Sequence, residues 1–324
     1  MKKVLFVAPD FFNYSEIIQE KLKEKGFDAE WFDDRPSKNL IDKCIIRVNK
    51  NLLKGKIKRY FYNKIYASMK EKKYDIIFVI VGLSFNRKMF EDLKTLSPES
   101  RFILYLWDSV KNLDEVVDFS KAFNETFSFD QYDCEKYGFK FLPLFYNEER
   151  KTDEIKYDVS FISTIKTGKL PYINKIKKEL DSQFDNNFFY LFLQSKIVFL
   201  YNKILNKEFR KAKFKDFVYK RMEYKTNNDI VLKSRFVLDV PMKNQDGLSM
   251  RTFECLGYHK KLITTNKNIL NYDFYKPENI YYYDGNEIDF NNVFFNSDYQ
   301  EIDEVILNKY SLDNWINQLF NSEV

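Results

Sequence analysis

The sequence has few of the residues that phosphate loops, metal centres and disulfides require. Its 324 residues include 8 Gly, 7 Pro, 3 Cys and a single His. No Gly-x-Gly-x-x-Gly is present, and Ser163 stands where a Walker sequence ending at Lys169 needs its first glycine, which disfavours dinucleotide dehydrogenases and P-loop NTPases. The lone His259 excludes a three-His metal site, and the lack of Cys-x-x-Cys excludes a zinc knuckle.

Long apolar runs and metal-binding acidic motifs are missing as well. No stretch approaches the ~20 apolar residues needed to span a bilayer, and the apolar run at residues 4–8 ends too soon at Asp10 for a signal peptide. Widely spaced cysteines, odd in number, suit a reduced compartment, so we expect a cytoplasmic protein. Because no Asp-x-Asp occurs, a transferase that clamps a diphosphate through a metal is disfavoured, and we expect neither a metal nor a resident cofactor.

The residues that are present suit a globular protein of two α/β domains. Hydrophobic residues make up 44% and charged residues 31% of a chain about twice the usual domain length. Near-continuous apolar runs separated by helical patterns are typical of doubly wound parallel sheets. We expect strands at residues 4–8, 28–32, 75–81, 102–107, 125–129, 141–144, 157–163, 188–193, 236–240, 262–265 and 280–283, and helices at 16–25 (capped by Ser15), 170–180 and 310–322. A polar stretch at 147–156 predicts domains at 1–150 and 151–324, with the terminal helix tucked back.

Acidic residues follow several of the predicted strands. Asp10, Asp108 and Asp130 all lie at the carboxyl edge of the first sheet, where α/β sheets bind ligands. A carboxylate there can deprotonate an acceptor hydroxyl, and the buried aromatic run before Asp108 favours that residue. The alternative is that each of these residues caps a helix or closes a turn.

The most informative segment is 246–265, which predicts a loop, a helix and then a strand. Gly247 is expected to open the helix, so that the free N–H groups and positive dipole end bind an anion. Arg251 lies one turn in and can hold a phosphate, and Glu254 lies on the same face and can accept from two vicinal hydroxyls, as a ribose presents them. Asp246 and Glu254 could flank a ligand. The alternative is an ordinary amphipathic helix with Arg251 and Glu254 in a surface ion pair.

This segment resembles the donor-site helix of GT-B glycosyltransferases, in particular the spore-maturation-protein-like and polysaccharide-biosynthesis branches. Their Gly-x-x-x-Arg-x-Phe-Glu-x-Leu core is matched here by Gly247, Arg251, Phe253, Glu254 and Leu256. The resemblance implies two Rossmann-like domains facing a cleft, with the nucleotide-sugar donor on the second. It implies that Glu254 binds the ribose and that Asp246 faces the donor sugar. The remaining implied donor-site residues are Gly247, Leu248, Ser249 and Arg251, and the strand-end residues Ser163 and Thr164. His259 stands where the family usually has a small residue and is expected to be exposed on a turn, the alternative being ligand contact.

The implied activity is metal-independent transfer of a hexose or pentose from a nucleotide diphosphate sugar to a glycan or lipid-linked glycan. Its expected setting is the assembly of bacterial surface polysaccharide or lipopolysaccharide. Two alternatives stay open at this point. One is a nucleotide-sugar epimerase of the same fold, and the other is a non-catalytic protein that binds an anionic polymer such as nucleic acid.

Two segments combine basic and aromatic residues, namely 43–73 and 196–225. Helices of this composition can rest on an anionic membrane surface, here the inner face of the plasma membrane, which would suit an acceptor on a lipid carrier. They could equally be solvated helix faces whose apolar side packs into the protein. Nucleic-acid binding is the remaining alternative and is not expected.

Overall fold

The computed structural model describes residues 1–10, 13–37, 39, 42, 46, 50–113, 115–166, 168–242 and 245–320. The chain divides into two compact units: unit 1 contains Met1–Pro143 and Trp315–Val324, and unit 2 contains Leu144–Asn314. This division differs from the expected boundary after residue 150. Residues 144–150 belong to unit 2 because their backbone pairs there: Tyr146 N donates to Tyr310 O at 2.8 Å, and Arg150 N donates to Gly257 O at 3.0 Å.

Unit 1 is built on a parallel sheet with the strand order β2-β1-β3-β4-β5-β6. Its strands are β1 (Lys3–Ala8), β2 (Asp28–Asp33), β3 (Ile76–Ile80), β4 (Arg101–Leu106), β5 (Glu125–Ser128) and β6 (Lys140–Phe141). β1, β3 and β4 are almost wholly buried, as their unbroken apolar runs require when both faces of a sheet are covered.

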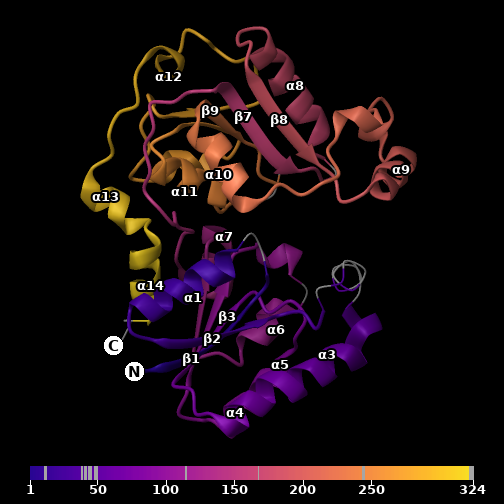
Figure 1. The fold of residues 1–324 in the computed structure, drawn as a ribbon, viewed down its shortest axis with the longest axis vertical. Helices are drawn as coiled ribbons and strands as arrows, with labels where there is room; N and C mark the ends of the chain where they lie inside the picture. The colour runs from indigo at the N-terminus through magenta and orange to yellow at the C-terminus, as the bar shows by residue number, and fades with distance from the viewer. Residues whose placement is uncertain are drawn as a thin grey trace. The chain divides into compact units, whose positions relative to one another are not determined.

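Helices cover both faces of this sheet (Figure 1). They are α1 (Tyr14–Glu24), α3 (Lys54–Tyr60), the π-helical turn η2 (Phe61–Tyr66), α4 (Ala67–Glu71), α5 (Arg87–Leu96), α6 (Val116–Ser120), α7 (Gln131–Tyr137) and the terminal α14 (Leu312–Phe320), with short 3-10 turns η1 (Lys50–Leu53) and η3 (Val110–Asn112). The end of α14 packs into unit 1, where the ring of Trp315 lies 4.7 Å from that of Tyr105 and 6.0 Å from that of Phe78. The terminal helix is therefore part of the core of unit 1.

Unit 2 has a parallel sheet with the order β11-β10-β9-β7-β8. Its strands are β7 (Tyr157–Thr164), β8 (Asn187–Phe192), β9 (Ser234–Asp239), β10 (Lys261–Thr264) and β11 (Ile280–Tyr282). Its helices are α8 (Leu170–Asp181), α9 (Lys196–Leu205), α10 (Tyr224–Leu232), α11 (Met250–Gly257), α12 (Val293–Asn296) and α13 (Glu304–Lys309), with 3-10 turns η4 (Lys207–Phe209), η5 (Phe214–Asp216) and η6 (Lys267–Asn271).

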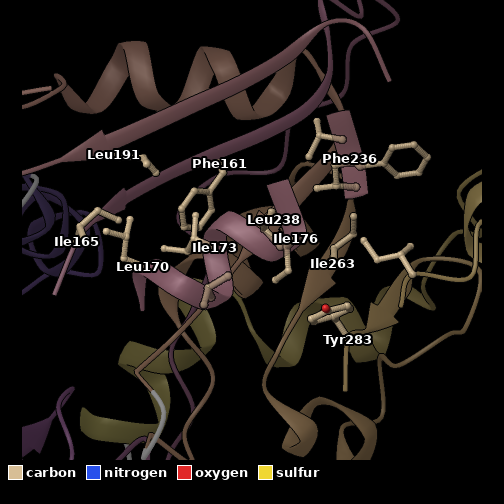
Figure 2. Packing of buried hydrophobic residues seen from close by; sticks show 14 of the residues in the cluster. Phe161, Ile165, Leu170, Ile173, Ile176, Leu191, Phe236, Leu238, Ile263 and Tyr283 are labelled. Carbon is tan, nitrogen blue, oxygen red and sulfur yellow. The ribbon is translucent and has the colours of Figure 1, made fainter. Parts of the chain in front are cut away.

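The core of unit 2 forms between α8 and one face of its sheet (Figure 2). Ile173 and Ile176 of α8 pack with Phe161 of β7 and with Phe236 and Leu238 of β9 in one buried cluster. Phe253 of α11 contacts a different set of rings, those of Phe274 and Tyr310, at 6.1 and 5.6 Å. This separation follows from right-handed crossovers that run in opposite directions along the sheet, from β7 to β8 through α8 and from β9 to β10 through α11.

Every strand expected from the apolar runs is present, and each bound lies within a few residues of the expectation. The expected cap of the first helix is wrong, because Ser15 lies inside α1 and its Oγ donates instead to Pro9 O at 2.7 Å. Within the described residues, no helix combines the length and apolarity needed to cross a bilayer. The arrangement of the two units, and with it the expected cleft, stays a prediction.

We predict that Gly257→Ala destabilises the protein by about 1–3 kcal/mol, because α11 lies too close to the segment beside it for an added methyl group. A Cβ at Gly257 would meet Glu148 O at 2.7 Å and the ring of Tyr146 at 2.8 Å. Urea unfolding measures the effect. The matched control is Gly55→Ala in α3, where nothing lies within 4 Å of the new atom and the helix should gain up to ~1 kcal/mol. Equal effects of the two substitutions would contradict this packing.

Candidate functional site

The candidate site in unit 2 lies where the sheet reverses its strand order. From β7 the chain passes to β8 on one side and then to β9 on the other. Loops after β7 and β9 therefore diverge at the carboxyl edge, which is the position where open α/β sheets bind ligands. Ser163 and Thr164 end β7, and the segment 240–249 follows β9 and leads into α11. The structure thus brings these sequence-predicted residues to one edge of one sheet.

Polar contacts fix the loop that joins β9 to α11. Ser249 Oγ donates to the carboxylate of Asp239 at 2.6 Å, and Lys169 Nζ at the start of α8 donates to Val240 O at 2.6 Å. The loop is also held from β10, because Asn268 Nδ2 after that strand donates to Asp246 O at 3.0 Å. These contacts hold the end of β9 and the residues that lead directly into α11.

The start of α11 differs from the expectation. The helix begins at Met250 with Ser249 as its N-cap, so Gly247 does not open it. Gly247 lies in the preceding loop, where its carbonyl accepts from Gln245 Nε2 at 3.1 Å, and Leu248 is buried with 1% of its surface exposed. Because the hydroxyl of Ser249 is turned to Asp239, it does not cap the helix. Thr252 N donates to the backbone carbonyl of Ser249 at 3.1 Å, and no side chain caps the helix start. A helix start that lacks a side-chain cap is a position where an anion can bind.

Arg251 and Glu254 form an ion pair on α11. Arg251 NH1 lies 2.7 Å from Glu254 Oε2, and the two side chains are 14% and 9% exposed. A second guanidinium nitrogen of Arg251 donates to Asn227 Oδ1 of α10 at 2.8 Å. The structure therefore contains the ion pair that an ordinary helix would have, but the pair is largely buried rather than superficial. It joins the two residues that the motif assigns to phosphate and ribose.

Further charges lie beside this pair. Burial raises the pKa of Asp239, partly offset by its hydrogen bond from Ser249 and by the positive charges of Lys169 and Arg251. Burial lowers the pKa of Lys169 in turn. Within the described part of the chain, no group of three His, Cys, Asp or Glu side chains is placed to hold a metal ion. At the carboxyl edge of the unit 2 sheet, charged side chains from α8, β9 and α11 thus offset one another.

The acidic residues predicted in unit 1 have local roles in the structure. Asp108 Oδ1 accepts from Ser109 N at 3.0 Å and from Asn112 Nδ2 at 2.8 Å, as a turn residue does. Asp130 caps α7. Asp10 lies at the carboxyl edge, and its backbone carbonyl accepts from Arg35 at 3.0 Å. The contacts of Asp108 and Asp130 match the alternative expected from the sequence, the backbone contact of Asp10 does not test it, and the choice of a catalytic base stays open.

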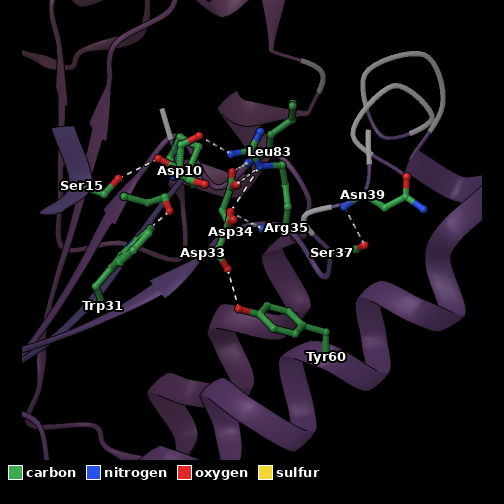
Figure 3. A network of polar contacts seen from close by, with 12 residues as sticks. Asp10, Ser15, Trp31, Asp33, Asp34, Arg35, Ser37, Asn39, Tyr60 and Leu83 are labelled. Atoms are coloured by element: carbon green, nitrogen blue, oxygen red, sulfur yellow. Dashed lines mark hydrogen bonds and ion pairs between the residues drawn. The ribbon is translucent and has the colours of Figure 1, made fainter. Parts of the chain in front are cut away.

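A buried acidic cluster in unit 1 was missed by the sequence analysis (Figure 3). Asp34 follows β2, is 1% exposed, and its Oδ2 accepts from Leu83 N at 3.2 Å. Its Oδ1 lies 3.4 Å from Nε of Arg35, which also lies 3.2 Å from Asp33. Burial, with a smaller contribution from Asp33, raises the pKa of Asp34 to about 7 against the opposing effect of Arg35. The only signal in the sequence was two successive acids at a strand end.

This cluster connects the loops after β1, β2 and β3, and β1 and β3 flank the reversal of strand order in unit 1. The loop after β3 has Val81 at φ 65° and Gly82 at φ 67°. A β-branched residue in that conformation is strained, and such strain gathers at functional sites. A cavity of about 430 Å³ opens beside the same loop, between Leu83, the start of α5 and the segment before α6.

Comparison with known proteins adds to this geometry. Neither a protein-family model nor a curated protein sequence matches the chain. Among solved structures, it is similar to the lipopolysaccharide outer core galactosyltransferase WaaB in its apo form, with a TM-score of 0.58, 12% identity, and 99% of this chain and 100% of that chain covered. It is also similar to Anabaena HepE in complex with UDP and glucose (TM-score 0.53, 11% identity) and in complex with UDP-glucose (TM-score 0.50, 12% identity), each with 99% of this chain and 96% of that chain covered.

The chain has the GT-B fold. This fold was expected from the sequence, and the two parallel α/β sheets confirm it. Identities this low show the fold alone, so the site residues rest on the geometry of this chain.

One residue of the GT-B motif region departs from the expectation. His259 is not exposed, since its side chain is 6% accessible and its two ring nitrogens lie 2.9 Å from Glu149 and 3.0 Å from Glu301. It follows the last turn of α11 with φ 51°. This left-handed position favours glycine, which accounts for the small residue usual in the resembling family. His259 is held within unit 2 by ion-pair geometry.

We predict that Asp34→Asn changes the pH dependence of stability. The folded carboxyl ionises near pH 7 and the unfolded one near the usual ~3.9. The unfolded chain therefore binds fewer protons between these values, and the parent loses stability as pH rises through them. The variant lacks this loss, so its stability relative to the parent should rise by more than about 1.4 kcal/mol between pH 5 and 8, in urea unfolding.

The control is Asp118→Asn. The hydrogen bond from Arg87 lowers the pKa of Asp118, so its titration lies below this window and the stability difference should stay flat. A flat profile for Asp34→Asn as well would show that Asp34 ionises at ordinary acidic pH.

Proposed function

We propose that the protein is a glycosyltransferase that moves a sugar from a nucleotide diphosphate sugar to a glycan acceptor, with the donor bound at the carboxyl edge of the unit 2 sheet. One observation carries the proposal: α11 begins at the strand-order reversal without a side-chain cap, with Arg251 in its first turn and Glu254 beside it. A helix start without a side-chain cap, the positive end of the helix dipole and a guanidinium together suit a diphosphate.

In this proposal, Arg251 and Glu254 give up part of their contact with each other and bind the donor instead. Arg251 turns part of its guanidinium from Glu254 to the diphosphate, which neutralises the charge that develops as the glycosidic bond breaks. Glu254 then accepts from the ribose hydroxyls. Asp246 faces the donor sugar, and the backbone of Gly247, Leu248 and Ser249 lines the diphosphate.

The end of β7 forms the other wall of the donor site. Ser163 and Thr164 are both partly exposed at the strand end, where hydroxyls can reach a phosphate oxygen. No metal is needed in this scheme, because the helix start and Arg251 supply the positive charge.

The acceptor is proposed to bind unit 1. The cavity beside the strained loop after β3 has charged side chains of both signs at its edge, among them Arg87 and Asp118, which lie 3.1 Å apart. Paired charges of this kind bind sugar hydroxyls. Asp10 and Asp108 remain the proposed bases, since Asp34 is too deeply buried to touch an acceptor.

The similar structures support the finer parts of the proposal. HepE was solved with UDP and glucose and with UDP-glucose, which favours a nucleotide hexose as donor. WaaB is a lipopolysaccharide outer core galactosyltransferase, which favours surface glycan assembly. Membership of the spore-maturation-protein-like and polysaccharide-biosynthesis branches, and a place at the inner face of the plasma membrane, belong to the same proposal.

We predict that Arg251→Lys weakens the binding of nucleoside diphosphates at least tenfold and has little effect on the binding of nucleosides. Lysine keeps the charge but loses the planar fork that holds both Glu254 and a phosphate. Thermal shift against the four common nucleoside diphosphates first finds the preferred base, and calorimetry then measures the affinity of each variant. Lys177→Met, which breaks an ion pair on α8, is the control and should bind like the parent.

We predict that Glu254→Gln reduces the preference of the protein for ribonucleoside over 2′-deoxyribonucleoside diphosphates. The carboxylate accepts from both ribose hydroxyls, whereas an amide has a single acceptor oxygen. An affinity loss equal for the two sugars would show a purely structural role. Incubation of the preferred sugar nucleotide without acceptor completes the test, since an epimerised product would overturn sugar transfer.

A further inference from the structure

Helix α9 turns a stripe of large apolar side chains toward solvent. Ile197, Leu200, Tyr201, Ile204 and Leu205 are 77%, 49%, 63%, 75% and 58% exposed. Their spacing places them on one face of the helix. In a globular domain this face would be expected to pack on the core, so its exposure marks an interaction surface.

The opposite side of α9 accounts for its attachment to unit 2. Phe199 is 1% exposed and belongs to the core cluster, where its ring lies 4.4 Å from that of Phe214 and 5.6 Å from that of Phe217. Ser195 caps the helix by accepting from Val198 N at 3.2 Å. α9 lies beyond the layered part of unit 2, after β8 (Figure 1). The helix is therefore anchored on one side and unpartnered on the other.

Positive charge surrounds the exposed stripe. Residues 196–225 contain ten Lys or Arg and three Asp or Glu, a formal charge of +7, whereas the whole chain carries +5. All ten basic residues are exposed. Among the described residues, Arg210, Lys211, Lys213 and Lys215 form no ion pair with an acidic side chain. The segment is strongly cationic, while the rest of the chain is slightly anionic.

We propose that α9 and the basic segment after it dock unit 2 onto an anionic lipid surface, with the stripe in the headgroup–acyl boundary and the lysines over the phosphates. An apolar face flanked by basic residues has the form of an interfacial amphipathic helix. A second copy of the chain is a poorer occupant, because the contact would bring two +7 segments together.

The other basic segment, residues 43–73, does not expose a stripe of apolar side chains in its described part. In residues 50–73, the apolar side chains Ile57, Phe61, Ile65 and Met69 are buried in unit 1, and the exposed Leu52 is a single residue. These helices match the alternative of solvated faces with a packed apolar side. The part of this predicted membrane contact in residues 43–49 lies largely outside the described residues. The observations thus favour α9 alone.

Vesicle sedimentation of the full-length protein tests the proposal. Vesicles of phosphatidylcholine alone are compared with vesicles containing 30% phosphatidylglycerol, at about 0.1 M salt. We expect binding to the anionic vesicles only. Ile197→Ser/Ile204→Ser should lower the partition coefficient at least tenfold. Lys211→Glu/Lys213→Glu should also lower the partition coefficient, and this loss should grow as the fraction of anionic lipid rises.

Matched controls use exposed residues elsewhere in unit 2. Val305→Ser, at a position 71% exposed in α13, and Lys178→Glu in α8 should sediment like the parent. The proposal is overturned if the parent ignores anionic vesicles or if the stripe variant binds them as the parent does. It is also overturned if the parent is a dimer that the stripe variant converts to monomer, since a second copy then covers the face.

The outcome is independent of the donor site. Nucleoside diphosphate affinity is measured on the same variants and should be unchanged, because α9 does not belong to the proposed site. A parent protein that binds nucleoside diphosphates but not anionic vesicles would overturn the docking surface alone, and a parent that binds the vesicles but no nucleoside diphosphate would overturn only the proposed function.

Discussion

The hydrogen bond between Ser249 and the buried carboxylate of Asp239 is the contact on which the proposed donor site of unit 2 depends. It ties the loop after β9 to the strand end and thereby sets where α11 begins. It also takes the Ser249 hydroxyl away from the helix, whose first turn then lacks a side-chain cap. A cap residue that does not cap costs helix stability, and a ligand that supplies the missing acceptor recovers it. The same hydrogen bond thus weakens the start of α11 and leaves it without a side-chain cap, as the proposed anion site requires.

The strand pattern of the sequence was sufficient for the architecture. Buried parallel strands are unbroken apolar runs, so β3 and β4 could be located directly. The sequence motif also located α11, but not its first residue. Gly247 suggested that the helix begins there, whereas Asn266 and Asn268 bind the carbonyls of Gly247 and Asp246 within the loop, and the helix begins at Met250. Side chains far apart in sequence decide such bounds, and no local pattern reports them.

The same limit explains why Asp34 escaped notice. Its properties come from three loops that meet only in the folded sheet, with Leu83 donating from one and Arg35 joining the other two. Asp108 has a similar local sequence yet finds two donors within its own turn. Whether a strand-end acid is a turn residue or a buried, protonatable group depends on which loops lie beside it, and that is set by strand order. α9 is the opposite case, because its amphipathic pattern was evident but only the structure shows which face is buried.

The buried ion pair constrains how a donor can bind at the proposed site. Arg251 and Glu254 neutralise each other, and removal of one partner would leave a buried charge at a cost of about 3–5 kcal/mol. A diphosphate alone would compensate the charge of Arg251 and leave the charge of Glu254 uncompensated. A ribose alone would bind Glu254 and leave the charge of Arg251 uncompensated. Only a ligand with both groups, at the spacing of residues one turn apart, compensates both charges at once. In the proposed site, the pair would therefore favour an intact nucleoside diphosphate over phosphate or nucleoside separately, without any contact to the base.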